Sequence, residues 1–193
     1  MRTPESSFPD RPVSTADIRR AFRDAPVSTL LSTGLGAGLF PVAPGTAGSA
    51  EGLALAWFLG FVLLRVTGSS VVASIGLLMS GLLVGLLAVP LSTRAARALA
   101  SRDPGCIVID EIAGQLLSSA PVPLFRHLSP RWEASVWLAS FLLFRLFDIW
   151  TPGAIRRLQE LPEGRGIVAD DLAAGAAAAA MTALLAWFVS ASP

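Results

Sequence analysis

The residues that could perform chemistry are carboxylates that interrupt or border long apolar segments. Two pairs of neighbouring acids occur, Asp110 with Glu111 and Asp170 with Asp171. Adjacent carboxylates destabilise each other's ionised forms, and a divalent cation relieves that repulsion. Oxygen ligands without histidine or cysteine favour Mg²⁺. The acids therefore predict a magnesium site. Its predicted ligands are Asp110, Glu111, Asp148, Asp170 and Asp171.

Each acidic pair is followed by a glycine at helical spacing. Asp110 precedes Gly114 by four residues, and Asp171 precedes Gly175 by the same interval. Residues four apart share a helix face, and glycine there lets a second helix approach closely. The similar segments indicate either a faint internal repeat or a coincidence in an alanine-rich chain. The alternative to a metal site is that the acids are interfacial residues, solvated or favoured by helix N-termini.

An arginine stands near the remaining acid of the predicted site. Arg145 and Asp148 are three residues apart on one predicted helix. They form either a local ion pair or a functional pair. In the second interpretation Arg145 clamps a phosphate and Asp148 is a metal ligand or base, because arginine suits bidentate phosphate contacts.

A segment with two glycines leads into a predicted helix at residues 44–49, Pro-Gly-Thr-Ala-Gly-Ser. A helix N-terminus of this kind presents backbone N–H groups and a positive dipole end to a phosphate. It lacks the Gly-Lys-Ser/Thr ending of a nucleotide-binding P-loop. The alternative is an ordinary helix cap. The candidate phosphate-binding residues here are Gly45, Thr46, Gly48 and Ser49.

Composition places these residues in a membrane protein. The chain has 193 residues, of which 53% are hydrophobic, with a mean hydropathy of +0.62. Its charges fall between long apolar runs, a pattern typical of membrane spans. A net charge of +1 gives no basic field for nucleic acid. The lone Cys106 and lone His127 exclude an internal disulfide and a multi-histidine metal site.

The apolar periodicity predicts an all-α integral membrane protein with about five membrane helices. Glycines and prolines between residues 30 and 44 predict a re-entrant loop, since irregular backbone at membrane depth must be satisfied by protein or water. The segment 107–120 is either a full span or a half-span, because a span needs about 20 residues. Residues 1–27 form a polar cytoplasmic arm, mobile or lying on the surface, and residues 28–193 form the membrane-embedded catalytic domain. The expected helices are 46–64, 70–91 with a possible continuation to Arg97, 107–120, 132–150 and 168–189.

The distribution of arginines predicts the orientation. With five passes, eleven arginines fall on the side of the N-terminal arm, and only Arg65, Arg126 and Arg131 fall on the other. The positive-inside rule places the first side in the cytoplasm. The predicted metal ligands then lie at the cytoplasmic end of their helices. Glu51 would lie there too, but it is the weakest candidate because it stands alone.

Four blocks of sequence resemble bacterial phosphatidylglycerophosphatase A. They occur in the order of that family, over about residues 29 to 176. The blocks are 33–36 continuing through 40–49, Asp110-Glu111 with Gly114, 144–149 with Pro152, and 166–171 with Gly175. One departure concerns Thr151, where the family pattern often has a basic residue, so that a phosphate contact would be missing or supplied by Arg156 or Arg157.

The resemblance implies a Mg²⁺-dependent enzyme of the bacterial inner membrane that hydrolyses phosphatidylglycerophosphate to phosphatidylglycerol and phosphate. Its partners would be the phospholipid substrate and the bilayer, with the oligomeric state left open. Attack by water is favoured over an aspartate nucleophile, because the chain lacks an Asp-x-Asp-x-Thr motif. Thr33 joins the expected phosphate-binding residues. The expected catalytic residues are Asp110, Arg145, Asp148 and Asp171.

Other functional classes make different predictions. A small membrane transporter of an ion or anionic solute, the main alternative, also uses broken helices and buried acids, but near the midplane of the bilayer. A CDP-alcohol phosphotransferase requires an aspartate motif that this chain lacks. A structural scaffold would not need so many acids within its membrane helices.

Overall fold

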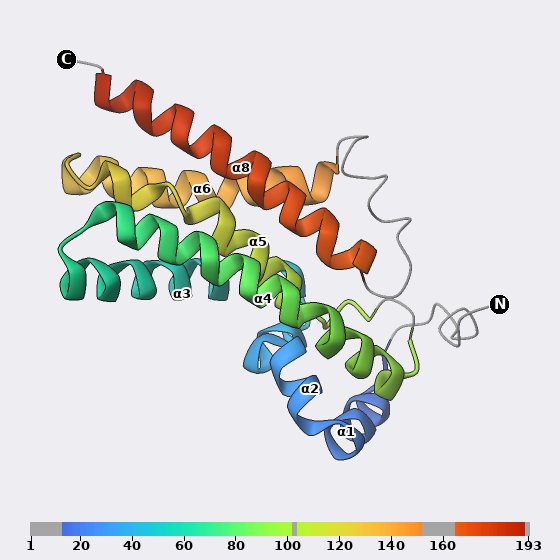
Figure 1. Cartoon of the computed structure of the whole chain (residues 1–193). Helices are drawn as coiled ribbons and strands as arrows, with labels where there is room; N and C mark the ends of the chain where they lie inside the picture. Colours follow the sequence, from blue (N-terminus) through green and yellow to red (C-terminus); the bar gives the residue numbers. More distant parts are fainter. Residues whose placement is uncertain (1–12, 102–103, 152–164, 192–193) are drawn as a thin grey trace.

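The computed structural model describes residues 13–101, 104–151 and 165–191, and its regular secondary structure in these ranges is entirely helical (Figure 1). Five longer helices form a bundle, and two shorter ones pack at one of its ends. The elements are α1 (Thr15–Asp24), α2 (Pro26–Ser32), the 3₁₀ segment η2 (Gly34–Leu39), α3 (Pro44–Thr67), α4 (Ser70–Leu99), α5 (Ile109–Ser119), the 3₁₀ segment η3 (Val122–Phe125), α6 (Pro130–Trp150) and α8 (Arg165–Ala191).

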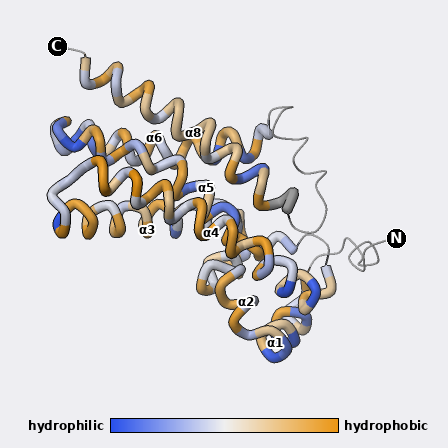
Figure 2. Tube along the Cα trace, viewed as in Figure 1, coloured by the Kyte–Doolittle hydropathy of each residue, from blue (hydrophilic) through white to orange (hydrophobic). Residues whose placement is uncertain are grey.

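Three of the described helices are long and apolar enough to cross a membrane. They are α3, α4 and the part of α8 from Val168 to Ala191, with mean hydropathies of 1.6, 2.4 and 1.9. Figure 2 shows apolar residues along most of their length. Large side chains such as Trp57, Leu86 and Trp187 are exposed on the outside of the bundle. An apolar surface of this extent identifies a membrane protein.

The interior of the bundle is built from small residues. Gly48, Gly52, Ala56 and Gly60 recur every four positions on the buried face of α3. The buried face of α4 is similar and includes Gly81, Gly85 and Ala88 among its members. Helices in lipid gain little from burying apolar surface against each other, so small residues that allow close backbone approach dominate their contacts.

Helix α5 lies at the centre of the bundle and contacts α3, α4, α6 and α8. Its 11 residues span about 16 Å, roughly half the ~30 Å hydrocarbon core. Helix α5 alone is therefore too short to cross the hydrocarbon core, as the half-span alternative for segment 107–120 requires. Polar side chains near its end bond within the bundle, because Gln115 Nε2 donates to Ser119 Oγ at 2.9 Å and Ser118 Oγ donates to the Ser140 carbonyl at 2.7 Å. Gln115 Oε1 is buried and has no partner among the described residues.

Helix α6 differs from the three apolar helices. It has 21 residues, enough to cross a membrane, but it carries Arg131, Glu133, Arg145 and Asp148. It is therefore not one of the three helices that qualify by length and composition. The expected count of about five membrane helices is not confirmed.

Residues 13–44 form a structured region beside the end of α4. Helix α1 packs on α4 and α2, and α2 and η2 continue toward α3. The backbone of the predicted loop is irregular after Ser32, with positive φ at Gly34, Leu35 and Gly36. The described part of the polar arm is thus helical and lies on the surface of the bundle. The possible continuation of the 70–91 helix to Arg97 is confirmed, since α4 ends at Leu99.

Candidate active site

Four helix ends meet at one end of the bundle. The N-terminal turns of α3, α5 and α8 lie there, together with the C-terminal turns of α6. Carboxylate oxygens of Asp110, Glu111 and Asp171 lie within 4.8 Å of one another. Asp110 and Asp171 are buried, with 3% and 6% of their surface exposed. The structure thus brings together three of the five predicted metal ligands.

Two glycines allow the acids of α5 and α8 to come together. A Cβ atom on Gly175 would lie 2.9 Å from the Gly114 Cα and would collide with the Gly114 carbonyl oxygen. A Cβ atom on Gly114 would lie 2.7 Å from the Asp171 carbonyl oxygen. The helices therefore cross with their backbones in contact one turn from the acids. This is the close approach that the Asp-x-x-x-Gly spacing predicts.

Arg145 reaches the same region from α6. Its Nη1 forms an ion pair with Asp148 and donates to Ser49 Oγ at 3.3 Å. Ser49 Oγ in turn donates to the Gly45 carbonyl at 2.8 Å. Both interpretations of the Arg145–Asp148 pair are thus compatible with the structure, since the local ion pair exists and also faces the start of α3.

Gly45 lies between the arginine and the acidic cluster. A Cβ atom there would collide with Glu111 Oε1 and lie 3.3 Å from Arg145 Nη1. The backbone amides of Thr46 and Ala47 already donate to the Ala43 carbonyl, at 2.9 and 3.2 Å. The amide of Gly45 is therefore the first donor of α3 that remains available for a phosphate. Glycine here leaves space between Glu111 and Arg145.

The oxygen donors fit a divalent cation. Glu111 Oε2 is buried and has no hydrogen-bond partner among the described residues, and the same is true of Arg145 Nε. A buried, unsatisfied carboxylate oxygen beside two further carboxylates is costly without a compensating positive charge. A cation such as Mg²⁺, which binds carboxylate oxygens and keeps several waters, would satisfy this group.

The remaining predicted ligands lie beside the cluster rather than in it. Asp148 is paired with Arg145, and its charge lies close enough to repel those of Glu111 and Asp171. Asp170 accepts a hydrogen bond from the Asp171 amide at 3.0 Å. Neither belongs to the group whose oxygens lie within 4.8 Å.

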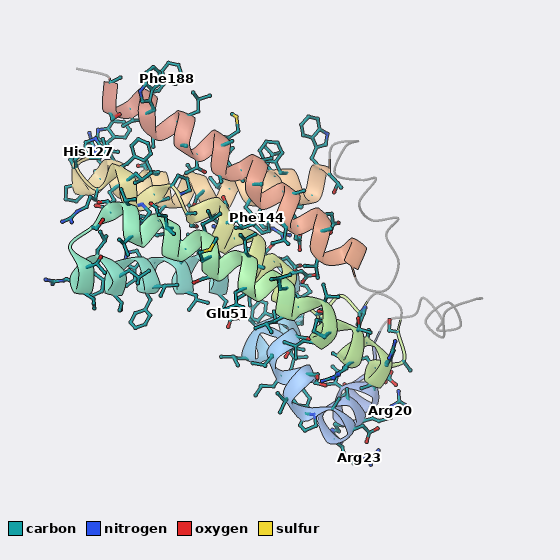
Figure 3. All side chains as sticks on the ribbon, in the orientation of Figure 1. Arg20, Arg23, Glu51, His127, Phe144 and Phe188 are labelled. Atoms are coloured by element: carbon teal, nitrogen blue, oxygen red, sulfur yellow. The ribbon has the colours of Figure 1, made fainter. Side chains whose placement is uncertain are left out.

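Thr33 and Glu51 lie outside the cluster of three acids. The Thr33 hydroxyl donates to the carbonyls of Thr29 and Leu30, at 2.9 and 3.2 Å, so in this structure it closes the end of α2. Glu51 has a buried oxygen without a partner in the described chain, packed against Gly34, and is likewise outside the metal-ligand group. Figure 3 shows Glu51 on α3 near the region of α2.

Thr151, which stands where the family pattern often has a basic residue, has a local structural role. Thr151 ends α6 with a φ of 41°, and its hydroxyl donates to the Asp148 carbonyl at 2.6 Å. Pro152, Arg156 and Arg157 lie outside the described residues, so the expected compensation by one of these arginines stays a prediction.

Two sets of contacts were not predicted from the sequence. One is the hydrogen bond from Arg145 to Ser49, and the other is the set of polar contacts between α5 and α6. Gln115, Ser118 and Ser119 occur together in an otherwise apolar segment, and that cluster was an available signal. Such residues in a membrane helix usually face other helices, where they can bond.

The opposite end of the bundle holds a separate set of charges. Arg65, Arg126 and Glu133 line a cavity of about 370 Å³ with Phe61 and Leu64. Figure 3 shows His127 at this end and Arg20 and Arg23 at the other. The acids of the candidate site are thus gathered toward one end, unlike the midplane site expected of a transporter.

A family profile and several known proteins match most of this chain. The profile of the family described as phosphatidylglycerophosphatase A matches residues 30–186. A phosphatidylglycerophosphatase A of Haemophilus influenzae is 38% identical over 146 residues, which cover 75% of this chain and 80% of the relative.

Two further relatives cover similar shares. A phosphatidylglycerophosphatase A of Escherichia coli is 33% identical over 76% of this chain and 76% of its own length. A candidate phosphatidylinositol-3-phosphatase of Bacteroides thetaiotaomicron is 32% identical over 83% of this chain and 94% of its own length. No solved structure shows significant similarity to the chain.

Proposed function

The chain belongs to the phosphatidylglycerophosphatase A family, and we propose that it hydrolyses phosphatidylglycerophosphate to phosphatidylglycerol and phosphate. The observation that carries the proposal is the meeting of three carboxylates from α5 and α8 with an arginine from α6 at the start of α3. Anion-binding groups beside metal-ligand groups are what phosphoester hydrolysis requires.

The protein's own residues would bind and orient the phosphomonoester. Arg145 would neutralise its charge, because the guanidinium fork matches phosphate oxygens. The Gly45 amide and the dipole of α3 would add a second anion-binding contact. Ser49 and Asp148 hold the arginine in place from two sides. Water would attack phosphorus as the bond to the glycerol oxygen breaks, and the proton that the water loses would balance the one that the glycerol oxygen takes up.

Asp110, Glu111 and Asp171 would hold the divalent cation. When bound, a cation of this kind supplies positive charge to the transferring phosphoryl group. Asp170 and Asp148 border the cluster, repel its carboxylates and would add to its attraction for a cation. In this proposal the burial of Asp110 and Asp171 strengthens the effect, since charges interact more strongly away from water.

The proposed membrane arrangement puts the site at the cytoplasmic face of the bacterial inner membrane. In it α3, α4 and α8 cross the bilayer, α6 crosses as a fourth helix, and α5 is a half-span at the centre. The positive-inside rule supports this orientation, because the five-pass topology predicted from the sequence assigns eleven arginines to the side of the site. Segment 30–44 would lie at that face as an irregular, re-entrant element.

Phosphate release by the purified protein tests the proposed substrate. The panel is phosphatidylglycerophosphate, phosphatidic acid and phosphatidylinositol 3-phosphate in mixed micelles, since one relative is named for the last of these. We expect the highest kcat/KM with phosphatidylglycerophosphate. Faster release from another lipid would reassign the substrate, and no release from any of them would favour a transporter.

A further inference from the structure

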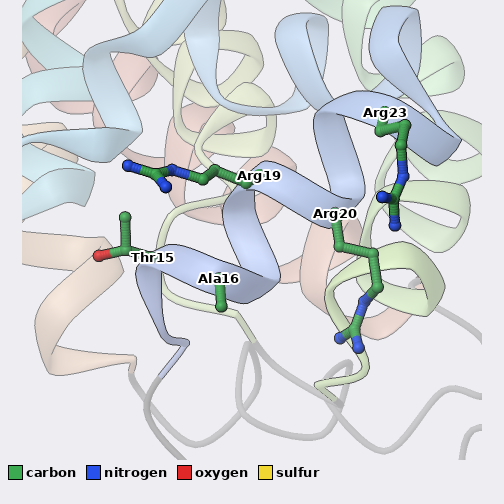
Figure 4. Close-up of a pocket in the computed structure, with 5 residues that line it drawn as sticks. All are labelled: Thr15, Ala16, Arg19, Arg20 and Arg23. Atoms are coloured by element: carbon green, nitrogen blue, oxygen red, sulfur yellow. The ribbon is translucent and has the colours of Figure 1, made fainter.

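Helix α1 carries a cationic surface that the proposed reaction does not use. It lies before residue 30, where the family match begins. A cavity of about 420 Å³ runs along it, lined by Thr15, Ala16, Arg19, Arg20 and Arg23. Figure 4 shows Arg20 and Arg23 extending on one side of the helix and Arg19 extending in another direction. The three guanidinium groups therefore spread around α1, and that of Arg20 reaches toward α4.

Helix α1 is fixed firmly to the end of α4. A capping box between Ser14 and Asp17 starts the helix. Ala21 is buried in one apolar cluster with Ala95 and Leu99 of α4. Arg20 Nε also donates to the Ala98 carbonyl at 3.4 Å. The arginines are therefore held at a defined position beside α4.

The positive charge of this surface is only partly compensated. Arg20 pairs with Asp17 at 2.7 Å, and Arg23 pairs with Asp24 at 3.1 Å in an exposed position that solvent screens. The Arg19 guanidinium has no ion pair within the described chain. On α1 itself three arginines stand against two aspartates, so this helix carries excess positive charge. The three are Arg19, Arg20 and Arg23.

The length of α4 places this surface at the level of lipid headgroups. Its 30 residues span about 45 Å, whereas the hydrocarbon core is about 30 Å thick. Its first turn is joined to the shorter α3 through Gly68 and Ser69, so the excess length lies at the end that carries Arg94 and Arg97. Helix α1 packs on this extension, so Arg19 and Arg23 lie where phosphodiester groups are found.

We propose that the surface formed by Thr15, Ala16, Arg19, Arg20 and Arg23 binds the headgroups of anionic phospholipids such as phosphatidylglycerol. Arginine contacts phosphate oxygens well, and each basic residue near an anionic membrane surface favours binding by about fivefold. This inference requires only the membrane placement of α4. It does not depend on the phosphatase activity.

Quenching of a fluorescent label tests the proposal with lipids that carry no phosphomonoester. The label is attached at Val27→Cys, an exposed position next to α1, in a Cys106→Ser background. The protein is reconstituted with phosphatidylglycerol or phosphatidylcholine carrying the same nitroxide. We expect phosphatidylglycerol to quench more strongly at equal mole fraction. Arg19→Gln with Arg23→Gln should reduce that preference by about tenfold or more and leave the melting temperature unchanged.

Matched variants separate this site from a general charge effect. Arg65→Gln with Arg126→Gln removes the same charge at the opposite end and should leave the preference intact. Arg19→Lys with Arg23→Lys should retain most of it, because charge carries the effect. Unchanged preference in the glutamine variant would overturn the proposal. Complete displacement by inorganic phosphate at constant ionic strength would also overturn it, because the site would then bind small anions rather than a lipid surface.

Discussion

At the scale of single residues, Asp110 and Asp171 are the most deeply buried of the proposed metal ligands. Each is almost fully enclosed, and their oxygens lie within 4.8 Å of each other and of Glu111. Asp110→Asn or Asp171→Asn keeps the shape of the side chain but removes a charged ligand. We expect kcat/KM for phosphate release to fall at least about a hundredfold, since a bound cation contributes several kcal/mol.

The control for these variants is membrane insertion. Both should fractionate with the membrane and elute from size-exclusion chromatography like the unmodified protein, because asparagine preserves the packing volume. Near-normal turnover in both variants would remove these aspartates from the mechanism.

Arg145 contributes geometry as well as charge. Its Nη1 contacts both Asp148 and Ser49, which positions the guanidinium at the start of α3. Lysine keeps the charge but not the bidentate fork, so Arg145→Lys should lower kcat/KM by about tenfold or more. Arg131→Lys, in an exposed position at the other end of α6, is the matched control and should have wild-type kinetics. Equal activity of the two variants would contradict a phosphate contact by Arg145.

At the scale of elements, the crossing of α5 and α8 determines whether the acids meet. Gly175→Ala would place a Cβ atom 2.9 Å from the Gly114 Cα and force the helices apart. We expect a destabilisation of about 1–3 kcal/mol and a marked loss of activity. Thermal unfolding in detergent and phosphate release measure the two effects.

Gly105→Ala provides the comparison for that variant, because a Cβ atom there would have no neighbour within 4 Å. It should match the unmodified protein in both assays. If Gly175→Ala behaved like Gly105→Ala, the helices would tolerate a wider spacing and the glycine argument would fail.

The sequence predicted the contact between these two helices better than it predicted the position of each helix within the bundle. The spacing of Asp110 to Gly114 and of Asp171 to Gly175 anticipated the close crossing, because both patterns are local to one helix. The position of α5 at the centre depends on contacts with four other helices, which no local pattern encodes. The Thr46 amide donates to the Ala43 carbonyl because the chain turns at Ala43, whose φ is 51°. Residue types alone do not reveal that conformation.

At the scale of the whole molecule, the predicted distribution of arginines implies that the two ends of the bundle face different compartments. Thr67 lies at the α3–α4 turn, and Asp24 lies at the end of α1, and both are exposed. In a Cys106→Ser background, a membrane-impermeant thiol reagent applied to spheroplasts should label Thr67→Cys. It should label Asp24→Cys only after lysis. The reverse pattern would invert the proposed orientation and place the acids on the outer face.

The most direct test of the account is the dependence of phosphatidylglycerophosphate hydrolysis on a divalent cation. Purified protein is treated with a chelator, and phosphate release is measured before and after Mg²⁺ is returned, in parallel with Asp171→Asn. The carboxylate cluster predicts at least about a hundredfold loss on chelation, full recovery with Mg²⁺, and little recovery in the variant. Undiminished hydrolysis by the chelated protein would contradict the central claim that Asp110, Glu111 and Asp171 hold a catalytic cation.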